Sequence, residues 1–270
     1  MASSQNNSPP ELLHVCEVID EAIGLLSRDV AEPFQGLGRY ESDVEARVLF
    51  IGLMRHVEGL LECADADLKL LPAGGTLARA AFEQGLRIRW LLHPTNVFDR
   101  EARFLAHLAE EEGMLRRSGK YSETDAFDPR SDQIAEFKIS VERALPPGIS
   151  RLKKLPKFDK MLEELGEIRR YATYTLLSQY THGSHFMGNL YRRGLGTGKT
   201  FGEQVSVKQW AVLLEIAWWS IFHAAQKIEQ TCARRDIRSL DDQRIEDIND
   251  RLSNLKESDQ TPNTVGRADG

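Results

Sequence analysis

The chain has 270 residues, of which 41% are hydrophobic and 28% are charged, and its formal net charge is −6. Such a composition can bury a hydrophobic core, and the negative charge argues against a protein that coats nucleic acid or an anionic membrane. The three cysteines, Cys16, Cys63 and Cys232, form no CxxC pair, which disfavours a disulfide framework or a cysteine zinc site. The first residues lack the basic and apolar regions of a signal peptide, so we expect a cytoplasmic protein.

Apolar residues recur at helical spacing along most of the chain, and no alternation typical of strands persists over a useful length. In chain order, the expected helices span residues 10–30, 44–71, 76–92, 96–118, 131–144, 158–165, 167–185, 207–234 and 240–255. Ser42 or Asp43 is expected to cap the second helix, the PAGG sequence at 72–75 to end it, and Thr76 to cap the third. A short extended piece is expected over residues 203–206.

Residues 210–225 are almost entirely apolar and contain three of the four tryptophans. Glu215 and His223 interrupt this segment, which is too short to span a membrane. An all-round apolar helix is typical of the centre of a bundle. We therefore predict an all-α fold, a single-domain helical bundle of about seven to nine helices. The expected organisation is a disordered lead at residues 1–9, the helical domain at 10–256 and a disordered tail at 257–270.

One stripe of the helix expected at 167–185 is polar. Its members, at spacings that place them on one helical face, are Tyr171, Tyr174, Ser178, His182 and His185. Histidine can exchange a proton near neutral pH, and hydroxyl groups can orient an imidazole or bind phosphate oxygens. The stripe is either a site or a seam in which His182 bonds to a facing helix, and both interpretations stay open.

A second polar row lies on the third expected helix, where Arg79, Glu83 and Arg87 follow each other at intervals of four residues. On a surface this would be an ion-pair ladder of small energetic value. Because most other sides of this helix are apolar, the pattern favours an internal polar network, in which buried charges must be paired. An Arg79–Glu83 pair facing His182 would position the imidazole and could hold a phosphate.

A basic cluster precedes the polar stripe in the sequence. Its residues are Arg151, Lys153, Lys154, Lys157 and Lys160, followed by Arg169 and Arg170. Such a cluster could attract an anion or RNA to the stripe, or it could be an ordinary solvated face.

No cofactor or metal motif stands out. The sequence GLGTGKT at residues 194–200 resembles a phosphate-binding loop, but Arg193 occupies the position of the first required glycine, and no apolar strand precedes it. Histidines 182 and 185 have no third ligand nearby in the sequence, which disfavours a metal site. We therefore expect neither a cofactor nor a metal.

Two motifs resemble those of an uncharacterised bacterial all-helical family, whose members carry R-x-x-x-E on one helix and later Y-x-x-x-S-x-x-x-H-G-S. The matching residues here are Arg79 and Glu83, then Tyr174, Ser178, His182, Gly183 and Ser184. More loosely, the architecture is similar to the HEPN superfamily, many of whose members are ribonucleases of toxin–antitoxin and phage-defence systems. The usual HEPN signature has four to six residues between an arginine and the histidine that follows it. In this chain the nearest upstream arginine, Arg170, is twelve residues from His182, so Arg79 would have to replace it in space.

The resemblance implies a defence or toxin-type effector that acts on RNA or nucleotides as a cytoplasmic homodimer. His182 would be the general acid or base and Arg79 would stabilise the phosphate, while Glu83, Ser178 and Tyr174 would orient them. Arg170, His185, Ser184 and Arg87 would bind the substrate. The alternative is a non-catalytic helical sensor or interaction module with a protein partner, in which the polar seam is structural.

Overall fold

The computed structural model describes residues 8–31, 40–121, 128–149, 154–182, 205–233 and 239–257, together with 152, 188, 190, 192–193 and 200–202. Within these residues the chain forms α1 (Pro10–Ala31), α2 (Glu41–Ala66), α3 (Leu71–Leu91), α4 (Val97–Gly119), α5 (Asp128–Ala144), α6 (Phe158–Glu164), α7 (Tyr171–Thr181), α9 (Val207–Ile228) and α10 (Asp242–Glu257). Shorter helical turns are η2 (Leu68–Leu70), η4 (Ile168–Arg170) and η6 (Glu229–Ala233). This described part confirms the prediction of an all-α helical bundle.

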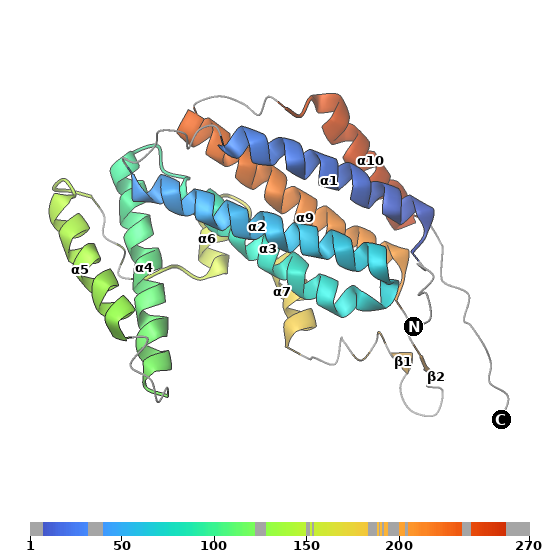
Figure 1. Cartoon of the computed structure of the whole chain (residues 1–270), viewed down its shortest axis with the longest axis horizontal. Helices are drawn as coiled ribbons and strands as arrows, with labels where there is room; N and C mark the ends of the chain where they lie inside the picture. Colours follow the sequence, from blue (N-terminus) through green and yellow to red (C-terminus); the bar gives the residue numbers. More distant parts are fainter. Residues whose placement is uncertain are drawn as a thin grey trace.

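The tryptophan-rich helix α9 occupies the centre of the bundle, as predicted. It packs against α1, α2, α3 and α10, which surround it in Figure 1. Trp210 and Leu214 are fully buried, and the Trp210 indole N–H donates to the backbone oxygen of Leu68 at 2.9 Å. Ser206 is the N-cap of α9 and forms a capping box with Gln209. The apolar sequence of α9 thus places it in the core that the other long helices share.

The junction between α2 and α3 differs from the prediction. Residues 72–75 do not form the loop that ends the second helix, because α3 already begins at Leu71 and has Pro72 in its first turn. Gly74 and Gly75 lie inside α3, where an added Cβ at Gly74 would come within 2.6 Å of the Trp210 ring and one at Gly75 would overlap the Tyr180 ring. These glycines therefore permit close packing of helices rather than a turn.

The predicted caps of these helices are also wrong. Tyr40 precedes α2 and makes no side-chain cap, while Ser42 and Asp43 lie buried within the first turn. The backbone N–H of Ser42 donates to the Glu101 carboxylate on α4 at 2.9 Å, and Asp43 lies 3.5 Å from Arg100 on the same helix. The first turn of α2 is thus satisfied by side chains of α4, a partner that no local pattern could indicate.

Helices α4 and α5 extend to one side of the main bundle as an antiparallel pair (Figure 1). Their contact includes the Lys138 ammonium, which donates to Glu112 at 2.8 Å, and a small apolar cluster separate from the main core. Asn96 caps α4 by accepting a hydrogen bond from the Phe98 backbone N–H. The ends of both helices agree closely with those predicted.

The helix expected at 167–185 is shorter than predicted and is divided. Turn η4 precedes α7, and α7 ends at Thr181, so His182 is its C-cap residue. Helices α6 and α7 both pack on α3, on the lower side of the bundle in Figure 1. The extended piece that the structure contains is β1 (Arg192–Arg193) paired antiparallel with β2 (Thr200–Phe201). Residues 203 and 204 of the piece predicted at 203–206 lie outside the described residues, as do residues 1–7 and 258–270.

Candidate functional site

Arg79 joins α3 to the C-terminal end of α7. Its Nε donates to the Glu83 carboxylate at 2.7 Å, one turn later on the same helix. Its Nη1 donates to the Thr181 hydroxyl and lies 3.2 Å from His182 Nε2, and its Nη2 donates to the Tyr174 hydroxyl at 3.4 Å. The Arg79 and Glu83 side chains are only 16% and 25% exposed. The two predicted motifs therefore meet in space, as an internal network rather than a surface ladder.

His182 lies at the open edge of this cluster. Its side chain is exposed, as is that of Thr181 beside it. Because a guanidinium carries donors and no acceptor, the contact with Arg79 requires a lone pair on Nε2. The proton of the neutral imidazole then resides on Nδ1. The cluster thus holds one histidine in a defined tautomer with access to solvent, an arrangement suited to proton exchange.

Aromatic rings form one wall of the cluster. The Tyr174 ring packs against Tyr171 and Phe158, with centroids 5.6 and 5.1 Å away, and the Arg79 guanidinium lies 5.4 Å from the centre of the Tyr174 ring. Ser178, which sequence spacing placed on the same face, donates its hydroxyl to the backbone oxygen of Tyr174 at 2.8 Å. The polar face of α7 therefore forms as predicted for Tyr171, Tyr174 and Ser178, but the Ser178 hydroxyl hydrogen-bonds within its own helix.

The position of α7 against α3 depends on Gly75. The Tyr180 ring lies over this glycine, where no other residue would leave room for it. Leu177 and Tyr180 form the buried face of α7, so Arg79, one turn after Gly75, comes within reach of the last turn of α7. The site is built by a close approach of two helices.

The residues predicted to bind substrate lie elsewhere or outside the description. Arg87 pairs with Glu110 at 2.8 Å and lies over the Phe158 ring. The Arg170 guanidinium stacks 3.7 Å from the centre of the Trp219 ring and lies 3.7 Å from Glu167. Ser184 and His185 lie outside the described residues. Arg87 and Arg170 therefore contact neither Arg79 nor His182 among the hydrogen bonds and ion pairs of the described chain.

A second group of polar residues lies near the other end of α3. Arg89 donates to both oxygens of Glu167, one of them at 2.9 Å, and its guanidinium lies 4.7 Å from the centre of the Trp219 ring. Burial alone would raise the pKa of Glu167, but the hydrogen bonds and charge of Arg89, aided by Arg170 and His223, outweigh it and hold that pKa below its ordinary value.

Arg89 of this second group also lines an open cavity of about 200 Å³. Its lining residues are Arg89, His93, Leu165, His223, Gln226, Lys227 and Gln230. Sequence reasoning missed the cavity because its walls come from α3 and α9, which lie far apart in the chain. The one local signal was the spacing of His223, Gln226 and Lys227, which places the three on one face of a helix.

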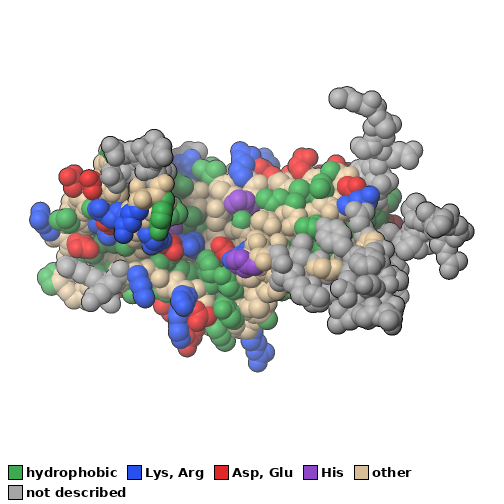
Figure 2. Space-filling view, turned by 90° about the horizontal axis from the view of Figure 1, so that it is seen from below, with side chains coloured by type: hydrophobic (Ala, Val, Ile, Leu, Met, Phe, Trp, Pro, Cys, Tyr) green, Lys and Arg blue, Asp and Glu red, His purple; other side chains and the backbone are tan. Residues whose placement is uncertain are grey.

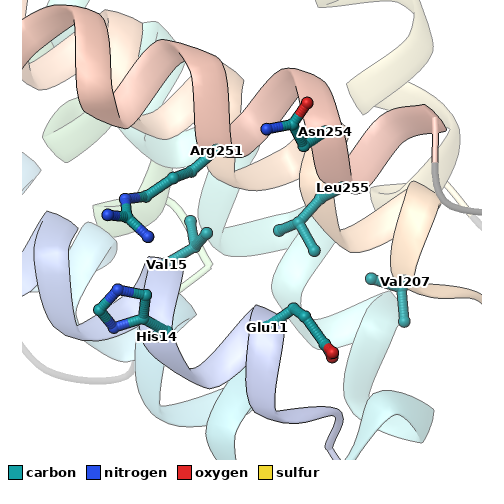
Figure 3. A pocket seen from close by; sticks show the side chains of 7 residues that line it. All are labelled: Glu11, His14, Val15, Val207, Arg251, Asn254 and Leu255. Atoms are coloured by element: carbon teal, nitrogen blue, oxygen red, sulfur yellow. The ribbon is translucent and has the colours of Figure 1, made fainter.

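A second hollow, of about 240 Å³, lies between α1 and α10 beside the first residue of α9. Figure 3 shows Glu11, His14 and Val15 of α1 facing Arg251 and Leu255 of α10 across it. Two of the polar groups at its rim have local partners, since His14 lies 3.4 Å from Glu17 and Arg251 donates to Asp247 at 2.7 Å. Val15, Val207 and Leu255 give it an apolar floor, and the carboxylate of Glu11 lies at its edge.

The surface around α6 and α7 carries mixed side chains. In the view of Figure 2, histidines lie near the middle of the face with lysine and arginine side chains on several sides. Of the predicted basic cluster, Lys154 and Lys157 are exposed, Lys160 pairs with Glu163 at 2.6 Å, and Arg151 and Lys153 lie outside the described residues.

Within the part of the chain that the structure describes, no group of three or more histidine, cysteine or acidic side chains is placed to hold a metal ion. None of the described helices has the length and apolar character needed to cross a membrane. The chain matches no protein-family model, no curated protein and no solved structure, so its function has to be argued from the geometry of its sites.

Proposed function

We propose that the chain is a HEPN-like effector that acts on RNA or a nucleotide, with His182 as its proton-transfer group. The observation that carries the proposal is the contact of an exposed histidine with an arginine, 3.2 Å from Nη1 of Arg79 to Nε2 of His182. An imidazole beside a guanidinium is the pairing that phosphate-ester chemistry uses, because one group moves a proton while the other neutralises developing negative charge.

Arg79 in this proposal both positions the histidine and receives a phosphate. Its bonds to Glu83, Thr181 and Tyr174 fix the plane of the guanidinium. Each terminal nitrogen of a guanidinium carries a pair of hydrogens, so Nη2 keeps an N–H for a further acceptor. A phosphate oxygen that takes this N–H and replaces His182 as an acceptor of Nη1 releases the lone pair of His182 Nε2 for catalysis.

In the proposed reaction the attacking hydroxyl and the leaving group both belong to the RNA substrate. His182 Nε2 takes the proton of a ribose 2′-hydroxyl, and the 2′-oxygen attacks the adjacent phosphorus. The bond from phosphorus to the 5′-oxygen breaks, and the imidazolium returns its proton to that leaving oxygen. The products are a 2′,3′-cyclic phosphate and a 5′-hydroxyl. Arg79 stabilises the charge on the phosphate oxygens, and Glu83 holds Arg79 in place.

The test is cleavage of a labelled single-stranded RNA by the purified full chain, with and without a chelator. Replacing His182 by alanine is expected to lower the rate by about 10²–10⁴-fold, the usual contribution of a general acid or base. His14→Ala is the matched control, because His14 is also exposed but lies on α1, away from the cluster. An unchanged rate for His182→Ala, or no cleavage by the wild type, would end the proposal.

The alternative is a non-catalytic sensor or interaction module with a protein partner. It is favoured by the near-complete internal use of Arg79, whose Nε, Nη1 and Nη2 all bond to other side chains of the same domain. In that case Arg79 fastens α7 to α3, and the exposed His182 contributes little. His182→Ala would then leave RNA unaffected and lower stability only slightly, whereas loss of Arg79 would loosen α7.

The biological setting of the proposal follows the resemblance alone. HEPN-like effectors of defence systems act in the cytoplasm as homodimers, and we extend both properties to this chain. Sedimentation of the purified protein at several concentrations tests the dimer, and a monomer at all of them would contradict it.

A further inference from the structure

The cavity at the C-terminal end of α3 is lined by cationic and neutral polar groups. Arg89 enters it from α3, and Lys227 and His223 enter it from α9. Gln226 and Gln230 add amide groups, and Leu165 is the one apolar side chain among the described lining residues. No carboxylate belongs to that lining.

The nearby carboxylates are already bound by arginines. Both oxygens of Glu167 accept hydrogen bonds from Arg89. Glu164 accepts from the Arg103 guanidinium at 2.9 Å and from the Trp90 indole N–H at 2.8 Å. These carboxylates are therefore occupied outside the cavity, and none of them neutralises Lys227.

Lys227 has no acidic partner among the ion pairs of the described residues. Burial is the main cause that lowers its pKa, and the positive charges of Arg100 and Arg89 lower it further. A half-buried ammonium surrounded by other cations is unfavourable unless something supplies negative charge. The chain therefore holds an arrangement that an anionic ligand would stabilise.

His223 adds a donor that depends on protonation. Its Nδ1 lies 3.2 Å from Oε1 of Gln226, which orients the ring with the proton on Nδ1 and leaves Nε2 for a ligand. Burial is the first cause that lowers the pKa of His223. The hydrogen bond to Gln226 opposes this effect, and the charged groups that act on His223 are Arg89, Glu167 and Arg170. His93, whose pKa burial and the charges of Lys227 and Arg103 lower, lines the same cavity.

We propose that this cavity binds a phosphate-type oxyanion, with Lys227 supplying the charge, and with Arg89, whose own charge Glu167 balances, and His223 supplying hydrogen bonds. The volume of about 200 Å³ is smaller than the roughly 300–1,000 Å³ of pockets for drug-sized ligands. It suits a phosphate or diphosphate group rather than a whole nucleotide. The site requires nothing of the chemistry proposed at His182, which lies at the other end of α7.

The two sites are separated by the length of α7. Its 11 residues rise about 1.5 Å each and span about 16 Å. Arg170 precedes α7 and stacks on Trp219, the ring that Arg89 also covers, while His182 follows the helix. The phosphate group can thus come from a free inorganic anion or from a nucleotide or RNA that extends along α7.

Calorimetric titration of the full chain tests the proposal and separates these sources. Inorganic phosphate, pyrophosphate, adenosine monophosphate and a short single-stranded RNA are titrated separately into protein in a buffer free of other oxyanions. At least one of the four is expected to bind. Lys227→Gln should weaken its affinity about tenfold or more, because the free energy of a hydrogen bond to a charged group corresponds to such a change in Kd. Which of the four binds most tightly identifies the source.

The matched control is Lys208→Gln, an exposed lysine at the start of the same helix α9, which should leave binding unchanged. Lys227→Gln should fold at least as stably as the wild type, because it removes a half-buried charge, and circular dichroism with thermal unfolding verifies this. The proposal is overturned if none of the four anions binds, or if Lys227→Gln binds as tightly as the wild type.

A pH series provides a second readout for His223. Sulfate is the probe, because its own charge stays constant between about pH 8 and about pH 6, where an ordinary histidine titrates. Binding of the anion raises the pKa of His223 back toward its ordinary value, so sulfate affinity should increase as the pH falls. His93 lines the same cavity, so His223→Gln should reduce this dependence, and His223→Gln combined with His93→Gln should remove it. An affinity that is the same across the range in the wild type would overturn the role given to His223.

Discussion

Replacing Arg79 by methionine should destabilise the protein by about 2 kcal/mol, because it removes the side chain that fastens α7 to α3. Methionine keeps the apolar stem but loses the guanidinium. An exposed ion pair one helical turn apart contributes about 0.3–0.5 kcal/mol, whereas a hydrogen bond to a charged group contributes about 1.5–3 kcal/mol. With 16% and 25% of the Arg79 and Glu83 side chains exposed, about 1 kcal/mol for their bond lies between these limits.

The bonds from Arg79 to Tyr174, Thr181 and His182 lie nearer the surface, and about 0.3 kcal/mol for each of the three brings the sum to about 2 kcal/mol. For a protein of this size the thermal midpoint should fall by about 4–8 °C. Urea unfolding of the variant gives the free energy directly. Arg55→Met is the matched control: Arg55 pairs with Glu58 at 2.6 Å but is 68% exposed, and its loss should cost less than about 0.5 kcal/mol.

Two outcomes would refute this account of Arg79. One is a loss of stability no larger than that of the exposed control. The other concerns Glu83→Gln, which should destabilise the Arg79→Met protein less than it destabilises the wild type. Arg79→Met leaves the Glu83 carboxylate without its partner, and Glu83→Gln then removes that unpaired charge. Strict additivity of the two changes would show that the 2.7 Å contact carries no energy.

Two further changes test the packing and the charges around the site. Gly75→Ala should destabilise by about 1–3 kcal/mol in thermal unfolding, since its Cβ would overlap the Tyr180 ring. Gly59→Ala, whose Cβ would lie at an ordinary 3.6 Å from Leu77, should instead stabilise by about 0.5–1 kcal/mol, and equal effects would contradict the close approach of α7. The pKa of Glu167 is lowered in the folded state from an ordinary value of 4.5. The unfolded chain therefore binds more protons below about pH 4.5, and stability should fall as acid titrates Glu167. In Glu167→Gln that acid-side slope of urea-unfolding free energy against pH should flatten, and an unchanged slope would show that other groups cause it.

The existence and approximate position of most helices were predictable because their apolar periodicity is strong. The central role of α9 followed from its apolar sequence, and the Asn96 and Ser206 positions are caps of the usual kind. Residues 72–75 misled the prediction because proline and two glycines are typical of a turn. There the packing of Trp210 and Tyr180 against bare backbone outweighed local preference, and that partner information lies more than a hundred residues away.

The candidate site was predictable in part. Spacing alone placed Tyr174 and His182 on one face, and the apolar surroundings of Arg79 indicated a buried pair. The end of α7 at Thr181 was not foreseen, and it is what makes His182 accessible to solvent. The hydroxyl of Ser178 donates to the backbone oxygen of Tyr174, because the carbonyl one turn earlier in a helix lies within reach of a serine side chain. The cationic cavity was beyond prediction, since it forms where α3 and α9 meet.

The bond from Ser42 to Glu101 has a consequence for how the chain acquires its shape. The start of α2 depends on a carboxylate that follows it by 59 residues, so a fragment that stops before α4 lacks the group that completes the first turn. During synthesis this end of α2 stays frayed until α4 has emerged and docked. Amide hydrogen exchange on a truncated fragment should find Ser42 unprotected while the middle of α2 is already closed.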